Sequence, residues 1–150
     1  MLTIGQIAPD FTLQDQNNNS TSLSDFIGEK IVIWFYPKAS TPGWTVEGEG
    51  FRDEFKKFQD NNIHIIGVSA DSPKKNKKFS DKHGFLYPLL SDENHNMLKD
   101  YGVWGPKKFM GKEYVGISRM TYLIDEKGKI KLVFDKVKTK THALDILNHL

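Results

Sequence analysis

The fold is decided by the stretch Lys30-Ile-Val-Ile-Trp-Phe-Tyr36, a continuous run of β-branched and aromatic residues that a proline then ends. Such a run is typical of a central strand that is buried on both faces. Residues 63–70, Ile-His-Ile-Ile-Gly-Val-Ser-Ala, have the same character, and Phe51, Phe55 and Phe58 recur at helical spacing between the two runs. The order strand, helix, strand predicts a βαβ unit with parallel strands.

Turn and cap residues place the segments around this unit. The polar tract Asn17-Asn18-Asn19-Ser20 predicts a hairpin turn between two extended segments. Ser72-Pro73 predicts the start of a helix that runs to His83, because serine caps helices and proline suits the first helical position. The other expected elements are a strand at 86–90, a helix at 92–101, a loop rich in glycine and lysine, a β-hairpin with strands at 120–125 and 129–135, and a helix at 141–150.

This order of elements is that of a thioredoxin-like α/β fold, in which helices flank a central mixed β-sheet. No internal repeat or low-complexity linker divides the sequence, so we expect a single domain over residues 1–150.

Composition and charge restrict the possible functions. The chain has 150 residues, and 21 basic side chains stand against 19 acidic ones, for a net charge of +2. This near balance argues against a protein dedicated to nucleic acid or to a membrane surface, and no apolar run is long enough for a transmembrane helix. We therefore expect a cytoplasmic protein. The absence of cysteine from the sequence excludes disulfides, zinc-thiolate sites and a thiol nucleophile.

The candidate functional residues lie where the first buried strand gives way to a helix, the usual place for ligands in open α/β sheets. Thr41 followed by Pro42 fits an N-cap and the first helical residue. Position 44 then lies in the first turn, beside unpaired backbone N–H groups and the positive end of the helix dipole. A cysteine there would have a lowered pKa and react as a thiolate, but this chain has Trp44.

The segment Tyr36-Pro37-Lys38-x-x-Thr41-Pro42-Gly43-x-Thr45-x-Glu47 resembles the active-site loop of peroxiredoxins, above all the peroxiredoxin Q group, also called bacterioferritin comigratory protein. The resemblance covers essentially the whole chain, and several motifs in order at consistent spacing are a strong signal. The further motifs are Gly5-x-x-Ala8-Pro9-x-Phe11, Phe51-Arg52-Asp53, Leu90-Ser91-Asp92, Tyr101-Gly102-Val103-Trp104-Gly105 and residues 119–125.

The resemblance implies a thiol-dependent peroxidase that reduces hydrogen peroxide and organic hydroperoxides. The peroxidatic cysteine of the family follows Thr-Pro-Gly, so its position here is Trp44. The residue matching Thr41 hydrogen-bonds the peroxide, Pro37 shields the pocket, and the arginine matching Arg119 stabilises the thiolate and the developing charge. Glu49 occupies the position of the resolving cysteine in many members. Turnover would therefore need an external thiol such as thioredoxin or glutaredoxin/glutathione.

Arginine usage draws attention to two positions. Of the 21 basic residues only Arg52 and Arg119 are arginines, and both fall in motif segments. A chain so rich in lysine is expected to use arginine where planar bidentate bonding matters. Glu47 and Asp53 are the expected partners of Arg52.

Three explanations of Trp44 are open: a deliberate replacement of cysteine, a natural pseudoenzyme, or a protein that uses the fold for binding. We favour the first, because Pro37, Thr41 and Arg119 are all kept. The chain is then an inactive variant of a one-cysteine enzyme, and the alternative is a pseudoenzyme that acts as a non-catalytic binding or holdase-like module. We also expect the indole to disturb its surroundings, so that the helix start is frayed or shifted, or Trp44 is turned toward solvent.

The remaining polar residues predict no further site. The five histidines lack metal-ligand spacing, so we expect no metal, and His64 is expected to be a packed or edge residue. The glycines form no phosphate-binding pattern, so we expect no cofactor. The lysines at 74, 75, 77 and 78 predict a solvated helix face, and we expect a monomer or a weak dimer.

Overall fold

The two apolar runs form the centre of the β-sheet, as predicted. In the computed structural model, strand β3 (Lys30–Phe35) pairs in parallel with strand β4 (Ile63–Ser69), with Lys30 opposite Ile63 and Phe35 opposite Val68. The structure describes residues 2–36, 42–109, 111–117, 120–134 and 146–147. Within these ranges, only the backbone is described for residues 42–47, 107–109, 112 and 114. Strand β3 ends at Phe35, two residues before the proline in the sequence.

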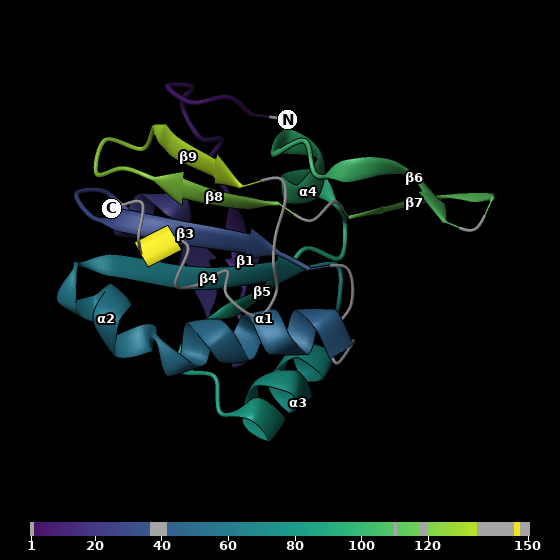
Figure 1. The fold of residues 1–150 in the computed structure, drawn as a ribbon, viewed down its shortest axis with the longest axis horizontal. Coiled ribbons are helices and arrows are strands. Elements are labelled where there is room, and N and C mark those ends of the chain that lie inside the picture. Colours follow the sequence, from purple (N-terminus) through teal and green to yellow (C-terminus); the bar gives the residue numbers. More distant parts are fainter. Residues whose placement is uncertain (1, 37–41, 110, 118–119, 135–145, 148–150) are drawn as a thin grey trace.

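The central sheet has seven strands in the order β2-β1-β5-β4-β3-β8-β9 (Figure 1). The pairs β3–β4 and β4–β5 are parallel and the other pairs are antiparallel, which gives the mixed sheet expected of a thioredoxin-like fold. The five strands not yet given are β1 (Thr12–Gln14), β2 (Ser20–Ser22), β5 (Leu89–Ser91), β8 (Thr121–Ile124) and β9 (Ile130–Phe134). Both predicted hairpins, β1–β2 and β8–β9, are confirmed.

Helices cover both faces of the sheet. Helices α1 (Pro42–Asp53), α2 (Phe55–Asp60) and α3 (Pro73–His83) lie along one face, and α4 (Asn96–Asp100) lies on the other (Figure 1). A short 3-10 helix, η1 (Leu23–Phe26), precedes β3.

The side chains of β3 point alternately to the two faces of the sheet and so belong to two separate parts of the core. Ile31, Ile33 and Phe35 pack on the α4 side, whereas Val32, Trp34 and Tyr36 pack beneath α1 to α3, and all six are at most 1% exposed. The central strand is therefore buried on both faces, as its sequence predicts.

The predicted helix at Ser72-Pro73 is confirmed. The Ser72 hydroxyl accepts a hydrogen bond from the Lys75 N–H at 3.3 Å, and Gly84 ends α3 at a φ of 67°. The lysines at 74, 75, 77 and 78 are exposed, as predicted for a solvated face. Among the described residues, no helix has the length and the apolar character needed to cross a bilayer.

The loop expected between residues 102 and 119 is a prediction that the structure corrects. Strands β6 (Trp104–Phe109) and β7 (Lys112–Ile117) form an antiparallel hairpin there, a separate sheet that projects from the body (Figure 1). The sequence obscures it because glycine and lysine are poor strand formers. We name this hairpin the arm.

Three other predictions need smaller corrections. The helix expected at 92–101 begins only at Asn96, because the Asp92 carboxylate accepts a hydrogen bond from the Leu98 N–H at 2.8 Å and His95 adopts a φ of 63°. The helix expected around residues 51–58 breaks at Glu54 into α1 and α2. The strand expected at 86–90 is β5, shifted toward the C-terminus. Of the helix expected at 141–150, only residues 146–147 are described, and they are helical.

Candidate functional site

The candidate site lies at the carboxyl end of β3, where α1 begins. Helix α1 starts at Pro42, as its sequence predicts, so the backbone of Trp44 lies in the first helical turn. The N–H groups of this turn have no partner within the helix, and the helix dipole is positive there. A group that becomes negatively charged would be stabilised at this position.

Several predicted site residues fall outside the described part of the chain. Pro37, Thr41 and Arg119 are among these residues, and the side chains of Trp44 and Glu47 are not described either. The frayed helix start, one of the expected alternatives, is not found, because the backbone is helical from Pro42 to Asp53. The orientation of the indole stays a prediction.

The chain next to Arg119 is fixed at the same end of β3. The Phe35 N–H donates to the carbonyl oxygen of Met120 at 3.0 Å, and Trp34 pairs with Thr121 in the antiparallel ladder of β3 and β8. Met120 follows Arg119 directly, and Phe35 is two residues before Pro37. Met120 therefore lies at the strand end from which the predicted site segment departs.

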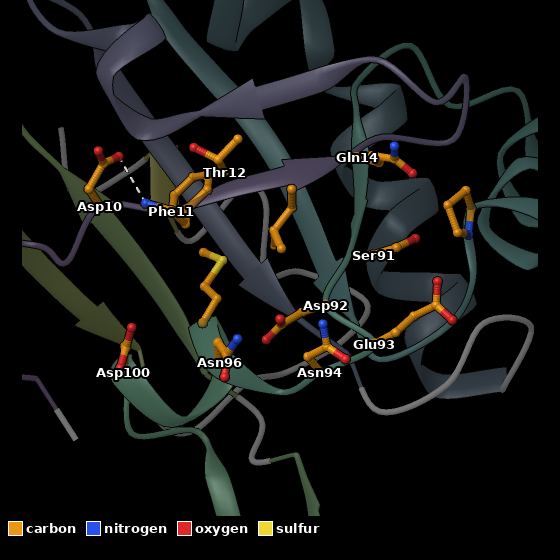
Figure 2. A pocket seen from close by; sticks show the side chains of 13 residues that line it. Asp10, Phe11, Thr12, Gln14, Ser91, Asp92, Glu93, Asn94, Asn96 and Asp100 are labelled. Carbon is orange, nitrogen blue, oxygen red and sulfur yellow. Dashed lines mark hydrogen bonds between the residues drawn. The ribbon is translucent and has the colours of Figure 1, made fainter.

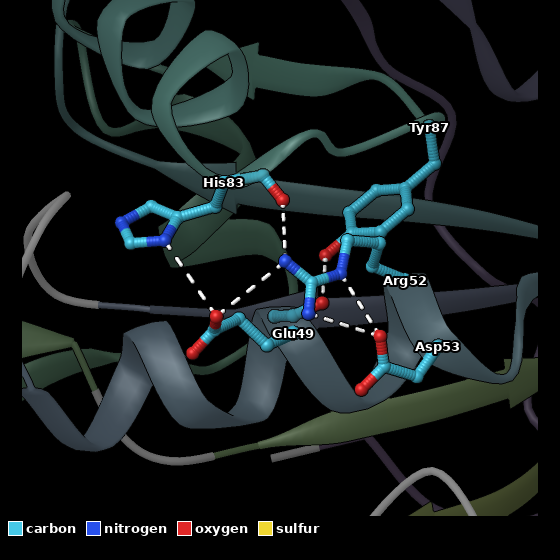
Figure 3. A network of polar contacts seen from close by, with 6 residues as sticks. Glu49, Arg52, Asp53, His83 and Tyr87 are labelled. Carbon is cyan, nitrogen blue, oxygen red and sulfur yellow. Dashed lines mark hydrogen bonds and ion pairs between the residues drawn. The ribbon is translucent and has the colours of Figure 1, made fainter.

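Arg52 stands at the centre of a polar network between α1 and α3 (Figure 3). Its guanidinium contacts the Asp53 carboxylate at 2.9 Å, which confirms one of the two predicted partners. It also donates to the carbonyl oxygen of His83 at 2.7 Å and approaches the Glu49 carboxylate at 3.4 Å. His83 is the last residue of α3, where carbonyl groups lack helical partners and the dipole is negative, so a cation there is favourable.

Glu49, at the predicted resolving-cysteine position, takes part in this network. Its carboxylate contacts Arg52 and lies 3.8 Å from Nδ1 of His83. The contacts with His83 are absent from the prediction because His83 is 31 residues from Arg52 in the sequence, and only the packing of α3 on α1 brings them together.

A second polar network lies at the strand ends, and the sequence analysis missed it. The Tyr36 hydroxyl donates to Oδ1 of Asn76 at 2.6 Å, and Nδ2 of Asn76 donates to the Ser91 hydroxyl at 3.0 Å. Burial raises the pKa of Tyr36 well above its ordinary range, so its hydroxyl stays a neutral donor. One signal could have revealed Asn76: it lies three and four residues before Phe79 and Ser80, on the buried side of α3.

His64 does not belong to a metal site in the described part of the chain. No group of three or more histidine, aspartate or glutamate side chains there is placed to bind a metal ion. The side chain is exposed and pairs with the Glu29 carboxylate, and its ring packs against Phe26 at a centroid distance of 5.1 Å. The prediction was a packed or an edge residue, and the ring contact with Phe26 fits the first of these, whereas β4 is an interior strand of the sheet.

A hollow of about 410 Å³ lies between β1, β5 and α4 (Figure 2), and no residue of α1 lines it. Its lining contains four carboxylates, from Asp10, Asp92, Glu93 and Asp100, and no basic side chain among the described residues. Burial raises the pKa of Asp92 above the usual carboxyl range. A reaction that builds negative charge would be opposed here, so this hollow does not compete with the end of β3 as the candidate site.

Comparisons with known proteins agree with the fold. The AhpC/TSA family profile matches residues 4–133. The chain is 45% identical over 149 residues to "Peroxiredoxin Bcp" of Escherichia coli strain K12, covering 99% of this chain and 96% of the relative. It is 44% identical over 149 residues to "Peroxiredoxin Bcp" of Bacillus subtilis strain 168, covering 99% and 95%.

Two solved structures show the same arrangement. A cysteine-to-serine mutant of PrxQ from Xylella fastidiosa matches with a TM-score of 0.93 and 32% identity, covering 99% of this chain and 95% of that one. The bacterioferritin comigratory protein of Xanthomonas campestris, described with alkyl peroxide reduction activity, matches with a TM-score of 0.88 and 37% identity, covering 93% and 88%.

Proposed function

The chain belongs to the AhpC/TSA family, within its peroxiredoxin Bcp group, and on that premise we propose that it is the scaffold of a one-cysteine thiol peroxidase whose nucleophile position holds Trp44. The observation that supports this most directly is the placement of the Trp44 backbone in the first turn of α1, at the carboxyl end of β3. The hydrogen bond from the Phe35 N–H to the Met120 carbonyl oxygen adds support, because it holds the residue next to Arg119 at the carboxyl end of β3.

With a cysteine at position 44, the chain would carry the groups needed to reduce a hydroperoxide. The thiolate attacks the terminal oxygen of a hydroperoxide, the O–O bond breaks, and the other oxygen leaves as water or an alcohol after taking a proton. The sulfur is oxidised to a sulfenic acid, which an external thiol reduces in two steps. Thr41 and Arg119 would orient the peroxide and stabilise the thiolate, and Pro37 would exclude water.

The chain as it stands has no cysteine, so we expect no peroxidase turnover. Assays with hydrogen peroxide or an alkyl hydroperoxide and a thiol reductant, thioredoxin or glutaredoxin/glutathione, should give no rate above a heat-treated sample. Turnover would contradict the assignment of position 44 as the only nucleophile position.

Trp44→Cys is the positive test. The helix N-terminus and Arg119 both favour the thiolate, so the new thiol should have a pKa below the free-cysteine value of about 8.5 and react with peroxide faster than free cysteine. With Glu49 in the resolving position, oxidation should stop after about one equivalent of peroxide unless a thiol is added. Trp44→Ser is the matched control, because it removes the indole without adding a thiol and should stay inactive.

The second candidate function is a non-catalytic binding or holdase-like module, and the observation that favours it is the complete absence of cysteine. The natural gene separates the two candidates. A cysteine codon at position 44 makes this chain an inactive variant of an enzyme, and a tryptophan codon makes it a pseudoenzyme.

A further inference from the structure

One buried amide joins the ends of the three parallel strands of the sheet. Asn76, on the second turn of α3, is fully buried. Its Oδ1 accepts from the Tyr36 hydroxyl at 2.6 Å and lies 3.4 Å from the Ser69 hydroxyl, and its Nδ2 donates to the Ser91 hydroxyl at 3.0 Å. Tyr36 follows β3, Ser69 ends β4 and Ser91 ends β5. Asn76 therefore ties α3 to three adjacent strand ends.

Tyr36 is fixed through its backbone, its ring and its hydroxyl. Its N–H donates to the Val68 carbonyl at 3.1 Å, which continues the pairing of β3 with β4 one residue past the strand. Its ring packs on Trp34 and on Phe79 at centroid distances of 4.7 Å and 5.7 Å. The hydroxyl bond to Asn76 fixes the far end of the same side chain.

Tyr36 is also the last residue before the predicted site segment. Residues 37–41 connect it to the start of α1, and two predicted site residues, Pro37 and Thr41, lie in that connection. Because a proline follows, the backbone of Tyr36 has little freedom of its own to absorb a shift. A displacement of Tyr36 would therefore pass into the connection.

On the basis of the proposed function, we propose that Asn76 is a positioning residue: through the Tyr36 hydroxyl it fixes the strand end from which the chain continues to positions 37, 41 and 44. In this role neither Asn76 nor Tyr36 touches the peroxide. The reason to expect an effect on rate is that misplacement by about 1 Å can slow an enzymatic step by about 100-fold.

The test uses the Trp44→Cys protein as background and adds Tyr36→Phe, Asn76→Leu, or both. The matched control is Tyr101→Phe, which removes another tyrosine hydroxyl bond, to the Pro9 carbonyl at 2.7 Å, outside this network. The readouts are the second-order rate constant of the new thiol with hydrogen peroxide and the stability toward urea. In the unmodified chain, hydrogen exchange of residues 36–47 is measured for the same substitutions.

We expect Tyr36→Phe and Asn76→Leu each to slow the peroxide reaction by about tenfold or more, and the double substitution to be no slower than the slower single one. Tyr101→Phe should lower stability by a similar amount and change the rate by less than about twofold. Exchange across residues 36–47 should rise with Tyr36→Phe and not with Tyr101→Phe.

If stability falls but the rate and the exchange pattern match those of the Tyr101→Phe control, Asn76 is merely structural and the proposal is overturned. If the Trp44→Cys thiol itself reacts no faster than free cysteine, the proposed peroxidase function fails. In that case a rise in exchange confined to residues 36–47 still supports the anchoring by Asn76, and its absence overturns it.

Discussion

Gly48 offers the sharpest test of the packing that supports α1. A Cβ atom at this position would lie 2.6 Å from Cζ of Phe85, far closer than carbon atoms in contact allow, and 3.2 Å from Cη2 of Trp34, which is a tight contact. The Phe85 ring has little room to move away, because it stacks on Tyr87 at 5.3 Å and meets Phe79 edge-on at 5.0 Å. Gly48→Ala must therefore push α1 away from the sheet.

Two effects of opposite sign determine the cost of Gly48→Ala. Alanine is favoured over glycine in a helix interior by roughly 0.5–1 kcal/mol. Overpacking of a tight core typically costs about 1–3 kcal/mol. The overpacking is larger, so we expect a net loss of about 1–2 kcal/mol, which for a chain of this length lowers the Tm by roughly 2–8 °C.

Urea denaturation followed by far-ultraviolet circular dichroism measures this loss. Gly105→Ala is the control, since no atom lies within 4 Å of the Cβ position there, and its stability should stay within about 0.5 kcal/mol of the parent. In the Trp44→Cys background, Gly48→Ala should also slow the reaction with peroxide, because α1 carries position 44. A Gly48→Ala protein as stable as the parent would refute the packing argument.

Two further predictions concern ionisation and the polar network. Burial raises the pKa values of Tyr36, Tyr101 and Tyr122 in the folded protein. Above pH 10 the unfolded chain therefore releases protons that the folded protein retains. The free energy of unfolding should then fall by up to about 1.4 kcal/mol per pH unit for each tyrosine. Absorbance at the tyrosinate band should then rise together with unfolding, and titration of these tyrosines in the folded state near pH 10 would contradict the prediction. Arg52→Lys keeps the charge but loses the fork that joins His83 and Asp53, and should cost about 1 kcal/mol in urea denaturation, since the side chain is 31% exposed. Lys57→Ala, which removes an exposed pair with Glu54, should cost less than half as much, and equal losses would show that the Arg52 fork has no special role.

The part of the fold that the sequence predicts is the part controlled by local pattern. The β-branched runs give β3 and β4, and the turn residues around Asn18 and Gly128, at φ values of 62° and 81°, give the two hairpins of the sheet. Serine and proline at the start of α3 give its first turn. Each of these signals lies within a few residues of the structure it specifies.

What the sequence did not predict has two physical causes. The arm has little local strand propensity, which the pairing of six residues along β6 with β7 outweighs. The other missed contacts join distant segments. Asn76 and Tyr36 are 40 residues apart, and Arg52 and His83 are 31 apart. Such partners become visible only once α1 and α3 are packed on the same face of the sheet.

The candidate site likewise has a part that the sequence predicts and a part that depends on distant contacts. The helix start at Pro42 follows from local sequence, and the role of position 44 follows from family resemblance, but neither shows what holds the strand end in place. Tyr36 is fixed by a neighbouring strand, a helix and two aromatic rings, none of which involves position 44. The anchor should therefore persist whichever residue stands at position 44. We therefore expect the scaffold to fold with either tryptophan or cysteine at position 44, which is why adding one sulfur atom there is a sufficient test of the proposed activity.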